Sequence, residues 1–132
     1  MVIGPHSLLI HTHLSSFTAA PFIITTHWPE SNFAWTHAEP HAEYLDLLEI
    51  AEKPWKRRWR CKSCGCTVAS YNSQTKKWVV CGTQFDRNEV GEIVGWDTIK
   101  PTAHIFYGTR LIDVLDNLEK WTGYEEKSER IS

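Results

Sequence analysis

Short runs of apolar, β-branched and aromatic residues dominate the chain. Residues 21–28 read Pro-Phe-Ile-Ile-Thr-Thr-His-Trp, which is typical of a strand. Residues 55–61 alternate bulky and charged side chains and also predict a strand. The runs 66–71 and 76–85 flank a polar segment, 72–75, so we expect them to pair as a hairpin. The mixed apolar and polar residues of 6–17 suit a further strand.

The remaining segments are less uniform. Residues 29–41 indicate a turn, a short alternating strand carrying Phe33 and Trp35, and a second turn at Pro40. Residues 42–53 fit either a helix or a strand. A helix over 111–118 is predicted by apolar residues at i, i+3, i+4 and i+7, namely Leu111, Val114, Leu115 and Leu118. The pattern therefore predicts a mainly β, or β-rich α+β, fold with one or two short helices.

Composition narrows the class of protein. A chain of 132 residues with 42% hydrophobic residues suits a single domain over 1–132. Its seven tryptophans favour β structure. A formal net charge of −2 makes binding of nucleic acid through bulk charge an unfavoured function. No apolar run approaches a membrane span, and the first residues lack the basic region of a signal peptide.

Three of the four cysteines lie within six residues, in Cys61-Lys-Ser-Cys64-Gly-Cys66. A secreted disulfide framework spreads its cysteines over the loops that it joins, so this clustering indicates a cytoplasmic or otherwise intracellular protein. A Cys-x-x-Cys followed by glycine is also half of a typical zinc site. The alternatives are reduced cysteines that pack, and a redox pair, although a redox pair usually accompanies a βαβ unit.

A tetrahedral zinc ion needs further ligands besides Cys61 and Cys64, and these must come from Cys66, Cys81 or histidine. Cys66 lies two residues from Cys64 and could share its face, or be a small packing residue. His11 and His13 are also two apart, and in a strand their imidazoles would point the same way. The alternative for this His-Thr-His segment is a solvated strand end.

Several segments together resemble the glutathione-dependent formaldehyde-activating enzyme-like family, which includes centromere protein V. They are the cysteine segment at 58–71, Gly82-Thr83-x-x-Asp86, the segment 101–110 (Pro-Thr-Ala-His-Ile-Phe-Tyr-Gly-Thr-Arg) and Lys120-Trp-x-Gly-Tyr124. The resemblance implies packed antiparallel sheets around a structural zinc ion. It also implies carbon–sulfur lyase chemistry on a small thiol adduct such as a glutathione conjugate.

The beginning of the chain departs from that family pattern. Members carry an early Cys-x-Cys and a Cys-His-Cys-x-x-Cys that holds a second zinc, whereas here no cysteine precedes Cys61. His11 and His13 fall near the first two of these cysteine positions. The resemblance therefore makes His11 and His13 the candidate catalytic residues, in a metal site rebuilt with histidine. The alternative is a non-catalytic family member that serves as a binding or scaffold module.

Two other features have both a functional and a structural interpretation. Residues 53–62 hold six basic side chains, which could bind an anion or form the solvated face of a strand. Strand alternation sends Arg58 and Arg60 to the face opposite Arg57, which breaks the charge into two groups. His104 fits a core position, while its place in the family motif makes it, with Trp28 and Arg110, a candidate to line the pocket. The sequence does not predict an oligomeric state.

Overall fold

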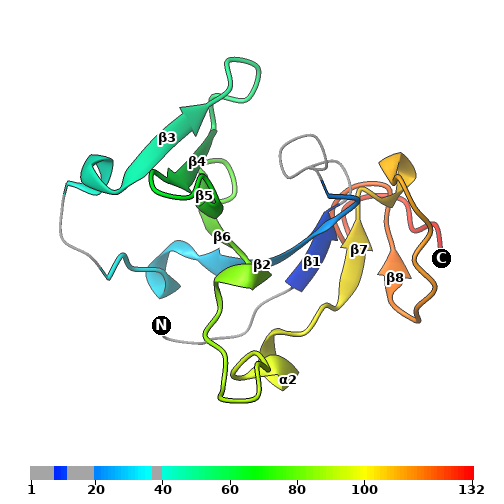
Figure 1. Ribbon diagram of the computed structural model, residues 1–132. Helices are drawn as coiled ribbons and strands as arrows, with labels where there is room; N and C mark the ends of the chain where they lie inside the picture. Colours follow the sequence, from blue (N-terminus) through cyan, green and yellow to red (C-terminus); the bar gives the residue numbers. More distant parts are fainter. Residues whose placement is uncertain (1–7, 12–19, 37–39) are drawn as a thin grey trace. The chain divides into compact units, whose positions relative to one another are not determined.

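The computed structural model describes residues 20–36 and 40–132 and, for residues 8–11, the course of the backbone. Strands predominate and the helical segments are short, which confirms the mainly β prediction (Figure 1). The chain divides into two compact units. Among the described residues, the first unit contains His27–Gln84, and the second contains Phe85–Ser132 together with β1 and the residues up to Thr26. No helix in these described ranges has the length and apolar character needed to cross a membrane.

The first unit is an antiparallel meander. Strands β3, β4, β5 and β6 follow one another in the sheet, and β2 lies next to β6. Strand β2 is Ile23–Pro29, and its residues from His27 onward belong to this unit. The other bounds are η1 Glu30–Asn32, η2 His41–Glu43, β3 Leu45–Glu49, β4 Lys56–Cys61, β5 Thr67–Asn72, β6 Lys77–Cys81 and η3 Gly82–Gln84. The strands predicted at 21–28 and 55–61, and the hairpin of β5 and β6, are thereby confirmed. The ambiguous segment 42–53 forms the short η2 and then β3.

The turn between β5 and β6 has a local cause. The Asn72 side chain is buried, and its Oδ1 accepts hydrogen bonds from the backbone N–H groups of Gln74 (3.0 Å) and Thr75 (3.3 Å). An asparagine that bonds the backbone two residues ahead favours a turn. The polar segment 72–75 therefore reverses the chain and sets the register in which Tyr71 faces Trp78.

The predicted strand at Phe33 and Trp35 is absent. After η1 the chain runs through 33–35 without ladder pairing, and both rings instead pack on Trp78. The alternation of large side chains here reflects two rings that join one aromatic cluster, which consists of Phe33, Trp35, Trp59 and Trp78. That packing, more than a backbone ladder, determines the course of the segment.

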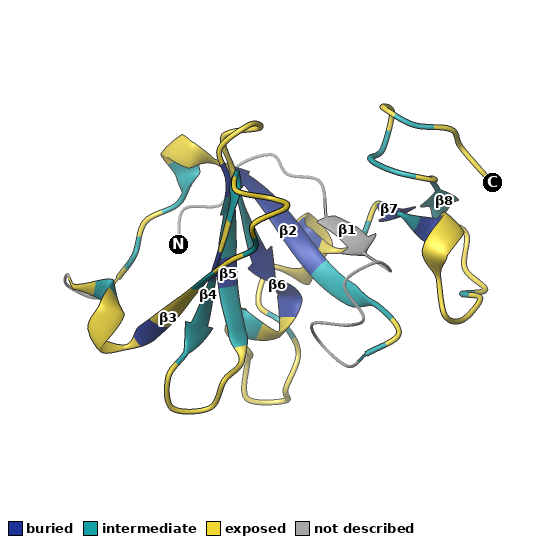
Figure 2. Ribbon diagram, turned by 90° about the horizontal axis from the view of Figure 1, so that it is seen from above, coloured by how far each residue is buried: buried dark blue, intermediate teal, exposed yellow. Residues whose placement is uncertain are grey.

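The second unit contains both parallel and antiparallel pairs. Strand β1 (Leu8–His11) pairs antiparallel with β2 and parallel with β7 (Ala103–Ile105), and β7 pairs parallel with β8 (Glu119–Lys120). Its helical segments are α2 (Trp96–Ile99) and η4 (Tyr107–Thr109). The core of this unit is β7, where Ala103 and Ile105 are fully buried (Figure 2). The two parallel pairs go beyond the antiparallel arrangement expected from the sequence.

The helix predicted over 111–118 is wrong. That segment has bends and irregular backbone, and Leu111 and Leu115, which should have been buried on one face, are 67% and 98% exposed. Its polar residues bond elsewhere, since Asp113 pairs with Arg110 and Asp116 pairs with His104. The backbone N–H groups also bond to side chains, since Val114 N–H donates to the Tyr107 hydroxyl oxygen and Leu118 N–H donates to Asp116 Oδ1, in place of helical backbone partners.

Candidate functional site

Three cysteines lie together at the turn between β4 and β5. Gly65 has φ +72°, a conformation that favours glycine, and its N–H donates to the Cys61 carbonyl oxygen (2.8 Å). The Cys61 N–H in turn donates to the Cys66 carbonyl oxygen (3.0 Å). The thiols of Cys64 and Cys66 are thereby held 3.2 Å apart, sulfur to sulfur, on the exposed side of the turn. The local geometry expected of a Cys-x-x-Cys-Gly turn is present.

These thiols differ in acidity. A hydrogen bond from the Cys66 backbone, followed by hydrogen bonds from the Cys66 and Cys61 side chains, lowers the pKa of Cys64. The shared hydrogen bond raises the pKa of Cys66. Burial raises the pKa of Cys81, which ends β6, to about 11. Of Cys64, Cys66 and Cys81, Cys64 therefore ionises first, and the thiolate is the form that binds metals and attacks electrophiles.

An aromatic pocket of about 410 Å³ lies in the same unit. Its walls include Trp28, Phe33 and Trp35, together with the small side chains of Ala69 and Val80 on β5 and β6. This volume falls within the usual range for small-molecule sites. The first unit therefore offers a cavity for a ligand as well as a cluster of thiols.

Gln84 connects the pocket with the cysteine turn. It lines the pocket, and its Nε2 lies 3.9 Å from the Cys66 sulfur, at the long end of the range for a sulfur acceptor. The pocket and the turn are thus neighbours on the same sheet.

The donor chemistry of the turn suits zinc, because cysteine thiolates are ligands that zinc prefers, and Cys64 and Cys66 are exposed and the pKa of Cys64 is lowered. The ligand number is smaller than a closed site requires, since the turn supplies three sulfurs. In the part of the chain that the structure describes, no group of three or more His, Cys, Asp or Glu side chains has the arrangement of a metal site. Binding would therefore require the three sulfurs to move so that they converge on one ion.

The histidines predicted as ligands and catalytic residues are only partly placed. His11 is the last residue of β1, where its backbone is opposite Ile23 and Ile105. It belongs to the second unit, whereas the cysteine turn belongs to the first. His13 lies outside the described residues. The roles expected of both histidines stay predictions.

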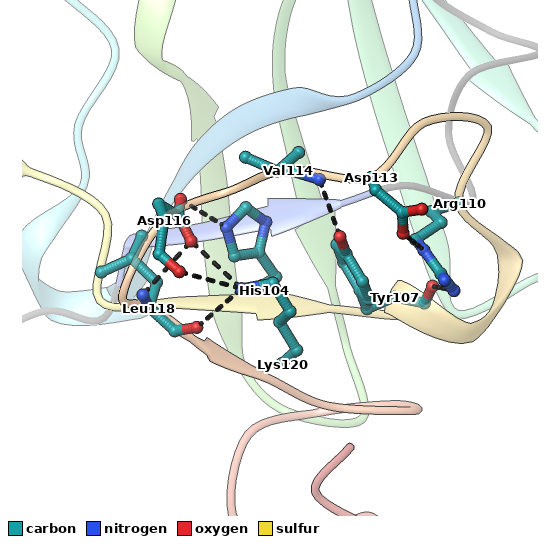
Figure 3. A network of polar contacts seen from close by, with 8 residues as sticks. All are labelled: His104, Tyr107, Arg110, Asp113, Val114, Asp116, Leu118 and Lys120. Atoms are coloured by element: carbon teal, nitrogen blue, oxygen red, sulfur yellow. Dashed lines mark hydrogen bonds and ion pairs between the residues drawn. The ribbon is translucent and has the colours of Figure 1, made fainter. Parts of the chain in front are cut away.

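His104, predicted as a pocket residue, lies in a polar network of the second unit (Figure 3). It is fully buried, and its Nε2 lies 2.8 Å from Asp116 Oδ2. Lys120 Nζ reaches the other oxygen of the same carboxylate at 3.2 Å. Burial works to raise the pKa of Asp116, but the hydrogen bonds from His104 and Lys120 outweigh it and lower that pKa. The contacts of His104 are those of a core histidine tied to a carboxylate.

The other two predicted pocket residues lie in different units. Trp28 lines the aromatic pocket of the first unit although it is almost fully buried. Arg110 belongs to the second unit, where it is bonded to Asp113 and lies over the ring of Tyr107, 4.6 Å from its centroid. Of the three residues, only Trp28 is among those that line the aromatic pocket.

The basic run at 53–62 is divided as the alternation predicts. Arg58 is buried, whereas Arg57 is exposed and paired with Glu49 at 3.0 Å. Trp59 lies on the same face as Arg57 and joins the aromatic cluster. The charges of this strand therefore point to both faces of the sheet.

Sequence reasoning missed several residues that matter here. Phe33, Trp35 and Trp78 form the pocket's aromatic surroundings, and the seven tryptophans were the signal that could have suggested such a cluster. No sequence pattern pointed to Gln84 as a functional residue. The pairing of Asp116 with His104 was not predicted, because the apolar spacing of 111–118 favoured a helix.

Comparison of the chain with family models, curated proteins and solved structures found no match. The class that the structure defines by itself is a mainly β protein with a turn of three cysteines beside an aromatic pocket.

Proposed function

We propose that this chain binds zinc through Cys61, Cys64 and Cys66 and acts on small thiol adducts such as glutathione conjugates, as a relative of the glutathione-dependent formaldehyde-activating enzyme-like family. The observation that carries the proposal is the contact of Gln84 with both the Cys66 thiol and the pocket. A ligand in this pocket would place its sulfur next to the cysteine turn.

The three sulfurs of the turn would supply three ligands, and His11 and His13 remain candidates for a fourth. Three protein ligands with an open position are typical of catalytic zinc sites, whereas four protein ligands are typical of structural sites. Bound there, zinc would supply Lewis-acid chemistry or activate a thiol or water. The chain's own contribution is to lower the pKa of the Cys64 thiol and to position a ligand through Gln84.

Elemental analysis of untagged protein tests the metal. We expect about one zinc per chain, lost in Cys64→Ser and retained in Cys81→Ser, because Cys81 is buried with a raised pKa. The Cys81 variant is the matched control, since it removes a thiol of the same unit outside the turn. A zinc content well below one per chain, or equal losses in both variants, would refute the proposal.

A binding module without catalysis is the second candidate. The observation in its favour is that, among the residues described, the pocket is lined without any histidine, lysine or carboxylate that could transfer a proton. Incubating the zinc-loaded protein with a glutathione conjugate and measuring released thiol separates the two. Release that depends on Cys64 supports the enzyme, whereas binding without release supports the module.

A further inference from the structure

We infer that the aromatic pocket of the first unit binds a flat, uncharged, aromatic group. Among the residues described, its lining includes no Asp, Glu, Lys or Arg. Burying a charged ligand group there would cost its hydration without a compensating ion pair. The lining therefore selects for neutral ligands.

The rings of the pocket are held in place from outside it. Phe33 stacks on Trp78 with centroids 4.0 Å apart and an interplanar angle of 12°. Trp35 meets Trp78 edge-on, with centroids 5.7 Å apart, and also contacts Trp59 at 5.8 Å. These contacts anchor Phe33 and Trp35 to the sheet, so they resist collapse into the cavity. Prepositioned rings favour a flat aromatic partner, which can stack or meet them edge-on.

Neutral polar groups in the pocket lining also favour particular ligands. Ser31, Asn32 and Gln84 contribute hydroxyl and amide groups to the lining. Such groups donate to a carbonyl oxygen or accept from an amide N–H, and their partners need carry no charge. A ring that bears a small neutral polar substituent matches this combination.

If the chain acts on thiol adducts, the preference for a neutral aromatic group indicates which part of the adduct enters the pocket. In that respect the inference rests on the proposed function. Glutathione carries charged carboxylates, for which the described lining holds no cationic partner. The pocket is therefore suited to the aromatic group attached to the adduct's sulfur, with the charged peptide outside. An aromatic conjugate should then bind better than an aliphatic one.

The test uses three small probes of similar size, namely benzamide, benzoate and toluene, titrated into the full chain and followed by NMR. We expect benzamide to shift the indole signals of Trp28 and Trp35, and benzoate to bind at least about tenfold more weakly because its charge finds no partner. Trp35→Ala should weaken benzamide by about tenfold. Trp96→Ala is the matched control, because Trp96 is 41% exposed in α2 and lies outside the pocket lining.

A second variant covers the case in which Trp35→Ala disturbs the fold. Gln84→Ala should weaken benzamide but leave toluene unchanged, since toluene lacks the group that Gln84 would bond. Equal affinities for benzamide and benzoate, or a Gln84 variant that affects neither or both probes alike, would overturn the inference.

Separate measurements of conjugate binding and zinc content test the proposed function. S-benzylglutathione should bind more tightly than S-methylglutathione, and Cys64→Ser should remove zinc while benzamide still binds. If benzamide binds the pocket but neither conjugate binds, the pocket inference stands and the proposed function falls. If zinc and conjugates bind but benzamide does not, the pocket inference falls alone.

Discussion

The hydrogen bond between His104 and Asp116 provides a quantitative test of the second unit. His104 is fully buried, and Asp116, whose side chain is 33% exposed, lies 2.8 Å from its Nε2. Asp116→Ala would leave that nitrogen buried without a partner, and would also remove a contact of Lys120. An orphaned buried polar group costs about 1–3 kcal/mol, and a hydrogen bond to a charged group contributes a similar amount. We therefore expect the free energy of unfolding to fall by about 2–3 kcal/mol.

Asp113→Ala is the matched control in the same segment. The pair between Arg110 and Asp113 is exposed, with 35% and 69% of the side chains accessible. Exposed ion pairs contribute about 0–1 kcal/mol, so this variant should unfold almost like the parent protein. In urea, where small proteins have slopes of about 1–3 kcal/mol per molar, the Asp116 variant should show a midpoint about 1 M lower. Equal midpoints for the two variants would refute the reasoning.

The pH dependence of this contact has a definite sign. The pKa of Asp116 is lower in the folded protein than its usual value. Its stabilising contribution is therefore present above the usual carboxylate pKa and is lost as the pH falls through the folded value. The stability difference between the parent protein and Asp116→Ala should shrink in acid, measured as the difference between urea midpoints.

Two further predictions concern the first unit. Burial, with Lys77 and Lys56 nearby, lowers the pKa of His27 from 6.5 to about 4, so folding stability should decline as the pH falls from 6.5 towards 4, and His27→Gln should flatten that decline in urea unfolding at several pH values. A variant with the same slope as the parent would contradict this assignment. In metal-free protein at neutral pH, iodoacetamide should modify Cys64 well before Cys81, because Cys64 is exposed with a lowered pKa and Cys81 is buried with a pKa of about 11. Peptide mass spectrometry gives the order of modification, and early labelling of Cys81 would count against the structure of this site.

The contrast between the β5–β6 hairpin and residues 111–118 shows where sequence patterns suffice. The hairpin depends on neighbours in sequence, since the Asn72 side chain bonds the backbone of the turn that follows it. The apolar spacing of 111–118 is also local, but it competed with partners distant in sequence. Asp116 pairs with His104, and the hydroxyl oxygen of Tyr107 accepts a hydrogen bond from the Val114 N–H (2.8 Å). The bond to Tyr107 occupies a backbone N–H that a helix would use, so the periodic pattern was misleading.

The sequence alone determined the mainly β class, the hairpin and the cysteine turn, because each depends on residues close together in the chain. The Cys-x-x-Cys-Gly spacing sets the course of its own backbone through Gly65. Only the tertiary structure decided that Phe33 and Trp35 pack on Trp78, and that Gln84 joins their pocket to Cys66. These contacts link positions far apart in sequence, and no local periodicity encodes which distant side chains a folded sheet brings together.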